Sequence, residues 1–208
     1  MERVAVSKEK RAHYTGETLL EYSLVVYPDA YLTGRIAEER RQFIKKYNAP
    51  AASVDIPYYI TVAEFKMRDG MEATLVRWMQ RICSMYHSFH VTLGNYNGTP
   101  AQAIFLQGQQ LQPFQQLGLQ LKTIDEYIRS SACPPIHIAQ QPCLHFATDL
   151  PEDIYRKAMP VYARQFFRAA FEVNELVLLA RDHAFHPGKA VQVFRFLPVS
   201  HQPEAVLA

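Results

Sequence analysis

The sequence predicts an α+β fold made of two similar lobes that share a central cleft. Strand-like and helix-like segments alternate in the order β-α-β-α-β, and this order occurs twice along the chain. Related segments also recur at a similar distance: Phe171-Glu172-Val173 follows Phe89-His90-Val91 by 82 residues, and His145 follows Tyr59 by 86. A repeated unit of this kind predicts two lobes about a pseudo-twofold axis, with equivalent central strands lining one cleft.

The first lobe is expected at about 21–100, after an N-terminal extension at 1–20. Strands are predicted where β-branched and aromatic residues concentrate, and helices where apolar residues recur every three or four positions. The strands predicted in this way cover 22–27, 56–65 and 88–94, and the helices cover 33–47 and 71–86. The charged residues of the first helix, among them Glu38, Glu39, Arg40 and Arg41, are interpreted as its solvated face.

The second lobe is expected at about 101–198, followed by a C-terminal tail at 199–208. Its predicted strands cover 103–107, 144–150, 171–179 and 191–197, and its helices cover 111–129 and 151–170. Pro160 predicts a kink or break in the second of these helices. The segment 130–142 contains Pro134-Pro135 and is predicted to be a loop, and His186-Pro187-Gly188 predicts the turn before the last strand.

Composition narrows the class of protein. The chain has 208 residues, of which 49% are hydrophobic and 20% charged, so it is long and apolar enough for a substantial core. A net charge of +2 does not by itself indicate a nucleic-acid-binding protein. Three widely spaced cysteines without a Cys-x-x-Cys pair indicate neither a disulfide framework nor a zinc site. We expect a cytoplasmic monomer with no metal, no cofactor and no membrane segment.

The cleft is predicted from the strand at 56–65. Alternation along a strand would place Tyr59, Thr61 and Ala63 on one face and Ile60, Val62 and Glu64 on the other. A tyrosine and a threonine side by side on an otherwise apolar strand indicate a cleft rather than a plain core. The strand at 144–150 places His145 at the matching position of the second lobe.

Taken together, these segments resemble the 2H phosphoesterase superfamily, which includes 2′-5′ RNA ligases and RNA 2′,3′-cyclic phosphodiesterases. The resemblance covers about residues 20–198 and depends on Pro57-Tyr58-Tyr59-Ile60-Thr61-Val62, the two Phe-x-Val strands and the His145 strand. It implies a bilobal α+β fold with antiparallel sheets lining the cleft and an exchange of strands between the lobes. It also implies that the protein binds or hydrolyses a 2′,3′-cyclic or 2′-5′ phosphate, so an RNA end or a small nucleotide is the expected partner.

Each lobe of a 2H protein carries a His-x-Thr/Ser-x motif. The two histidines act as general base and general acid, and the two hydroxyls hold phosphate oxygens. The corresponding segments here are Tyr59-Ile60-Thr61-Val62 and His145-Phe146-Ala147-Thr148. The resemblance therefore assigns catalytic positions to His145 and Tyr59 and phosphate binding to Thr61 and Thr148. Thr148 reaches the cleft only if a β-bulge re-aims it.

Two alternatives stay open at this point. A phenol with a pKa of about 10 is a poor base, so a catalytically inactive binding protein is the second functional hypothesis. The cleft histidine could also be a different one. His90-Val91-Thr92-Leu93 matches His-x-Thr-x, although its repeat partner at 171–174 has no histidine, and His137 lies 78 residues after Tyr59.

Overall fold

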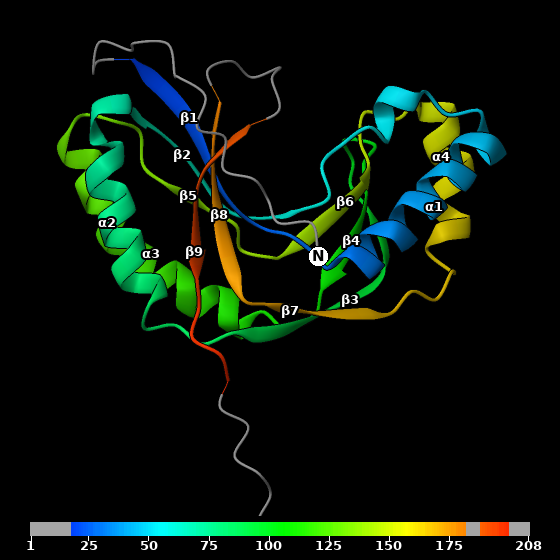
Figure 1. Cartoon of the computed structure of the whole chain (residues 1–208). Coiled ribbons are helices and arrows are strands. Elements are labelled where there is room, and N and C mark those ends of the chain that lie inside the picture. Colours follow the sequence, from blue (N-terminus) through cyan, green and yellow to red (C-terminus); the bar gives the residue numbers. More distant parts are fainter. Residues whose placement is uncertain (1–17, 182–187, 200–208) are drawn as a thin grey trace, which may run out of the picture.

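The computed structural model describes residues 18–181 and 188–199 (Figure 1). Most of the predicted N-terminal extension, of the turn at 186–188 and of the C-terminal tail lies outside these residues. The described strands are β1 (Leu19–Val26), β2 (Ile60–Arg68), β3 (Phe89–Gly98), β4 (Ile104–Gly108), β5 (His137–Ile138), β6 (Cys143–Ala147), β7 (Ala169–Val173), β8 (Glu175–Arg181) and β9 (Lys189–Arg195). The described α-helices are α1 (Ala30–Tyr47), α2 (Glu72–Cys83), α3 (Gln112–Ser130) and α4 (Glu152–Tyr162).

The described strands form one antiparallel sheet. Its order is β7-β3-β4-β6-β2-β1-β8-β9, and β5 pairs with β2 beside this path. Two groups of helices pack against the sheet: α2 with α3 on one half, and α1 with α4 on the other (Figure 1). The predicted α+β class is confirmed, but the sheets of the two halves are joined into a single sheet where β2 meets β6.

The two halves of the sheet each contain strands from distant parts of the chain. The C-terminal strands β8 and β9 extend the sheet beyond β1, and β3 pairs with both β4 and β7. The segment predicted as one strand at 171–179 is therefore two strands, β7 and β8, with Asn174 between them. The reason is their partners: β7 pairs with β3, whereas β8 pairs with β1 in the other half.

Local signals explain where α1 begins and ends. The side chain of Asp29 accepts a hydrogen bond from the backbone N–H of Leu32 at 2.8 Å, which satisfies an otherwise unpaired donor at the N-terminus. At the other end, Asn48 adopts the left-handed conformation that terminates helices. The helix predicted at 151–170 ends earlier, at Tyr162, and contains Pro160 in its last turn.

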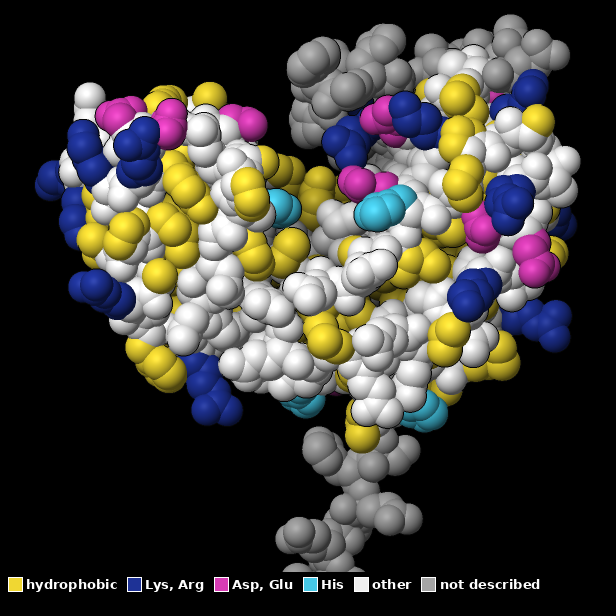
Figure 2. Space-filling model, turned by 180° about the vertical axis from the view of Figure 1, so that it is seen from behind, with side chains coloured by type: hydrophobic (Ala, Val, Ile, Leu, Met, Phe, Trp, Pro, Cys, Tyr) yellow, Lys and Arg dark blue, Asp and Glu magenta, His cyan; other side chains and the backbone are white. Residues whose placement is uncertain are grey.

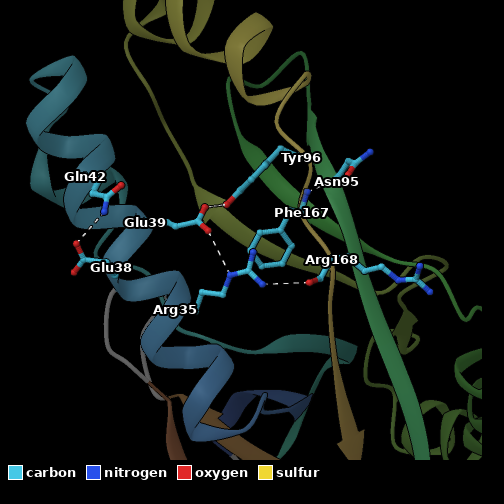
Figure 3. Close-up of polar contacts among 8 residues, drawn as sticks. All are labelled: Arg35, Glu38, Glu39, Gln42, Asn95, Tyr96, Phe167 and Arg168. Atoms are coloured by element: carbon cyan, nitrogen blue, oxygen red, sulfur yellow. Dashed lines mark hydrogen bonds and ion pairs between the residues drawn. The ribbon is translucent and has the colours of Figure 1, made fainter.

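Aromatic and polar contacts hold helix α1 to the half of the sheet that contains β3 and β7 (Figure 3). The hydroxyl of the buried Tyr96 on β3 donates to the carboxylate of Glu39. Arg35 lies 3.7 Å from the same carboxylate and donates to the Arg168 carbonyl at 3.2 Å. The Arg35 guanidinium also lies over the Phe167 ring, 4.2 Å from its centroid. These contacts tie α1 to β3 and to the segment that leads into β7.

Candidate functional site

The candidate site lies in a hollow between the two groups of helices. Figure 2 shows this hollow, with histidine side chains on both of its sides. The strand pairing places the predicted residues in it. Ile60 on β2 pairs with Leu144 on β6. Because neighbouring residues in an antiparallel pair also face each other, Tyr59 lies opposite His145 and Thr61 lies opposite Cys143.

The row through Tyr59 and His145 continues on both sides. His145 is also paired with Phe105 on β4, and Phe105 in turn with Asn97 on β3. On the far side, the Tyr27 ring meets the Tyr59 ring edge to face, with 5.8 Å between centroids. Directly paired residues share a face of a sheet. These five side chains therefore form one row across the hollow, in the order Tyr27, Tyr59, His145, Phe105 and Asn97. The structure thus brings Tyr59 and His145 together, while their roles stay predictions.

A β-bulge in β2 changes the face predicted for two residues. Leu24 pairs with Ala63 and Val25 with Thr61, which leaves Val62 as the extra residue. Val62 and Ala63 are both buried in the core. The prediction that Ala63 shares the face of Thr61, with Glu64 on the other face, is therefore wrong. The bulge moves the alternation by one residue and places Glu64 on the Thr61 face.

A second bulge occupies the matching position in β6. Ile104 pairs with Ala147 and Phe105 with His145, so Phe146 is the extra residue. Phe146 and Ala147 are both fully buried. Alternation resumes one residue later, so Thr148 is the next residue expected on the His145 face. Its backbone N–H donates to the Ser53 carbonyl at 2.8 Å, which holds this end of the strand.

Arg40 connects the two motif segments. Its guanidinium donates to the Ile56 carbonyl and to the His145 carbonyl, each at 2.7 Å, and lies over the Tyr58 ring at 4.1 Å from the centroid. Arg40 is only 2% exposed, so its assignment to a solvated helix face is wrong. The sequence did contain a signal, because Arg40 lies four residues after Ile36 and three before Phe43, on the apolar stripe of α1.

Charge and desolvation set the protonation of Tyr59 and His145, the central pair of the row. The His145 residue is exposed to the hollow, but neighbouring atoms desolvate its ring and lower its pKa below the ordinary 6.5; the positive charge of Arg40 lowers it further, and Glu64 partly opposes both. The imidazole is therefore neutral at pH 7. Burial also raises the pKa of Tyr59 above 10, so its phenol keeps its proton. One neutral acceptor and one protonated donor face each other across β2 and β6.

Cys143 and Glu64 also belong to this face, although sequence reasoning did not select them. The Cys143 sulfur lies 4.0 Å from Nε2 of His145. Burial raises the pKa of this thiol, so it stays protonated at neutral pH and is not a thiolate nucleophile. Glu64 lies 3.7 Å from Arg181, whose guanidinium also donates to the Ser23 hydroxyl at 3.0 Å.

The two alternative histidines lie outside the row through Tyr59 and His145. His90 is exposed on β3 opposite Glu172 of β7, outside the row through His145. His137 is paired with Glu64 and so lies on the same face of the sheet as Thr61, where it lines a charged hollow of about 410 Å³ beside the row through Tyr59. Among residues 18–181 and 188–199, no group of three or more His, Cys, Asp or Glu side chains is placed to hold a metal ion. None of the described helices is long and apolar enough to span a membrane.

Solved structures of similar fold align with this chain over almost the whole of their own length. The crystal structure of E. coli LigT with 3′-AMP matches with a TM-score of 0.58 and 17% identity, over 86% of this chain and 99% of LigT. The chain has the 2H phosphoesterase fold. The crystal structure of a Thermus thermophilus protein matches this chain with a TM-score of 0.59 and 14% identity, over 86% of this chain and 99% of its own. The crystal structure of a phosphoesterase matches with a TM-score of 0.53 and 15% identity, over 86% of this chain and 98% of its own.

These likenesses concern the 2H fold, at identities too low to carry an activity. No family model matches the sequence, and it matches no curated protein. The expected fold resemblance is confirmed. The motif positions stay predictions: Tyr59 is the residue expected at the first histidine position, and Ala147, expected at the second hydroxyl position, is buried at a bulge in β6.

Proposed function

We propose that the hollow binds the phosphate of a nucleotide or RNA end, as a 2′,3′-cyclic or 2′-5′ phosphodiester, between Tyr59 and His145. The observation that carries the proposal is the pairing of Ile60 with Leu144, since this register sets the protonated phenol of Tyr59, directly before β2, opposite the neutral imidazole of His145 on β6. Crystal structures of LigT in complex with 3′-AMP, ATP and NADP+ support a nucleotide as the ligand.

In the proposed hydrolysis, the neutral His145 takes a proton from a water molecule as its oxygen attacks phosphorus. One ring P–O bond breaks, and the ribose oxygen that leaves takes the proton of the Tyr59 hydroxyl. The proton on His145 then returns to the phenolate through solvent. Thr61 and Thr148 would donate hydrogen bonds to the non-bridging oxygens as their negative charge increases. The step consumes one water and yields a phosphate monoester and a free hydroxyl.

The second candidate is a protein that binds the nucleotide without turnover. The raised pKa of Tyr59 favours it, because a phenol that holds its proton tightly is a weak general acid. Under this candidate Tyr59 donates a hydrogen bond to phosphate, and His145 contributes to binding alone.

The two candidates are separated by measuring hydrolysis of nucleoside 2′,3′-cyclic monophosphates by chromatography, alongside binding by calorimetry. If the protein is an enzyme, His145→Ala lowers kcat/KM by about 10²–10⁴, whereas the matched control His90→Ala leaves it unchanged. Binding without hydrolysis by the wild type identifies the second candidate. A wild type that neither binds nor hydrolyses these compounds would overturn the proposal.

Restoring the family residue gives a gain-of-function test. Tyr59→His would provide a second group that titrates near neutral pH, opposite His145. We expect kcat to rise about tenfold or more over the wild type, measured in the same hydrolysis assay. If Tyr59→His gains no activity while it still binds the nucleotide, Tyr59 does not occupy the functional position of the missing histidine.

A further inference from the structure

We infer that the base of the bound nucleotide lies in an uncharged, amide-lined hollow between β3 and β4, next to His145. This inference rests on the proposed function and specifies which side of the phosphate carries the nucleoside. The hollow has a volume of about 340 Å³ and carries four side-chain amides but no charged group. The residues that line it are Gly94, Asn95, Asn97, Gln107, Gly108, Gln109 and Leu111.

Strand pairing relates the amide hollow to the proposed phosphate position. Phe105 is paired with His145, and Gln107 is paired with Cys143, which lies on the His145 face. Asn97 is paired with Phe105 from the other side. The Phe105 and His145 rings are 6.5 Å apart between centroids. A nucleoside that extends from a phosphate at His145 toward β3 therefore passes over Phe105 and reaches these amides.

The chemistry of the hollow suits a nucleobase. The edges of bases present donors and acceptors side by side, and an Asn or Gln side chain offers one group of each kind. Phe105 is only half-buried, so part of its ring is open for stacking, which tolerates any base. Not all four amides are equally available. Oδ1 of Asn95 already accepts the Phe167 N–H at 3.2 Å, whereas Gln107 makes only a long contact of 3.4 Å to Gln141.

The hollow on the other side of the central pair differs in charge. Beside Tyr22, Ser23, Phe65, Pro134 and Pro135, its lining includes the charged or titratable side chains of Glu21, Glu64, Lys66, His137 and Arg181. Its cations are already close to carboxylates, with Lys66 at 2.8 Å from Glu21 and Arg181 at 3.7 Å from Glu64. A neutral base in that hollow would displace water from charged groups without replacing their hydrogen bonds. This contrast orients the nucleoside toward β3 and β4.

The test compares Gln107→Ala with the matched surface control Gln120→Ala, whose side chain is exposed on α3. Calorimetry measures the binding of inorganic phosphate, 3′-AMP and a short oligoribonucleotide with a 2′,3′-cyclic phosphate end. We expect Gln107→Ala to weaken 3′-AMP binding about tenfold and to leave phosphate binding unchanged, with no change for Gln120→Ala. Thermal unfolding of each variant verifies that the fold is intact.

The outcomes separate the two proposals. Phosphate binding with an unchanged affinity for 3′-AMP in Gln107→Ala would overturn the base site and leave the proposed function standing. A wild type that binds none of the three probes would overturn both. If Gln107→Ala weakens the binding of 3′-AMP and of the oligonucleotide equally, the result supports a base site that a single nucleoside fills. A wild type that binds only the oligonucleotide, with the same loss in Gln107→Ala, supports a site for the terminal base of RNA.

Discussion

At the scale of single residues, the contact between Arg40 and His145 sets a pH dependence. Desolvation and Arg40 both lower the pKa of His145 below 6.5. The unfolded state therefore binds more protons than the folded state between that lowered pKa and 6.5. The free energy of unfolding should fall as pH drops through this window, and His145→Asn should remove this part of the slope. Urea unfolding at several pH values from 7 to 5 measures it.

The charge of Arg40 is tested by titrating the His145 ring by NMR. Arg40→Met removes the repulsion, so we expect the pKa of His145 to rise toward 6.5. Arg40→Lys is the matched control, since it keeps the charge while it loses the paired hydrogen bonds to Ile56 and His145. If both variants shift the pKa equally, the effect comes from the loss of structure and not from charge.

At the scale of elements, the bulge in β6 decides which hydroxyl can serve the cleft. Thr148→Val should weaken phosphate binding about as much as Thr61→Val, because each removes one hydroxyl from the same face. Ala147→Ser should not improve binding although it completes the motif in sequence. Calorimetry with inorganic phosphate measures both effects. Improved binding in Ala147→Ser, with Thr148→Val unchanged, would contradict the role given to the bulge.

The same bulge predicts a cost in stability. Ala147 is fully buried, so its replacement by serine places a hydroxyl in the core. We expect Ala147→Ser to lower the free energy of unfolding by about 1–3 kcal/mol. Thr148→Val, at a half-buried position, should change it by less. Urea unfolding of the two variants provides the comparison, and equal stabilities would contradict the burial of residue 147.

At the scale of the whole molecule, one continuous sheet and one main core predict cooperative unfolding. The principal buried cluster includes residues from both helix groups, such as Phe43 of α1 and Leu121 of α3. Tyr96→Phe removes the hydrogen bond to Glu39 between β3 and α1. We expect it to lower the free energy of unfolding by about 1–2 kcal/mol in a single transition. Fluorescence and circular dichroism during urea unfolding measure this.

A matched control lies on the same helix. Tyr31 of α1 is 79% exposed, so Tyr31→Phe should leave stability unchanged. Two separate transitions in the wild type would show that the halves unfold independently and would contradict the single-unit prediction. Equal effects of the two substitutions would show that the Tyr96 contact adds nothing to stability.

The sequence by itself determined the alternation of elements, the repeat and the most informative pair in the hollow. Tyr59 and His145 were predicted at equivalent positions, because local hydrophobic patterns and a similar spacing of 82 and 86 residues can be read from the chain alone. The replacement of a motif histidine by Tyr59 stays a prediction of the same kind. The burial of Arg40 was not predicted. Its place on the apolar stripe of α1 can be read from the sequence, but its partners, two backbone carbonyls, cannot.

Only the tertiary structure decided the bulges, the division of 171–179 into β7 and β8, and the gathering of Glu64 and Cys143 on the His145 face. Each depends on strand register, which is set between segments far apart in the chain. A shift of one residue moves every later side chain to the other face without altering the sequence pattern. The face of Thr148, and with it the second hydroxyl of the proposed site, is decided by the pairing of β6 with β4.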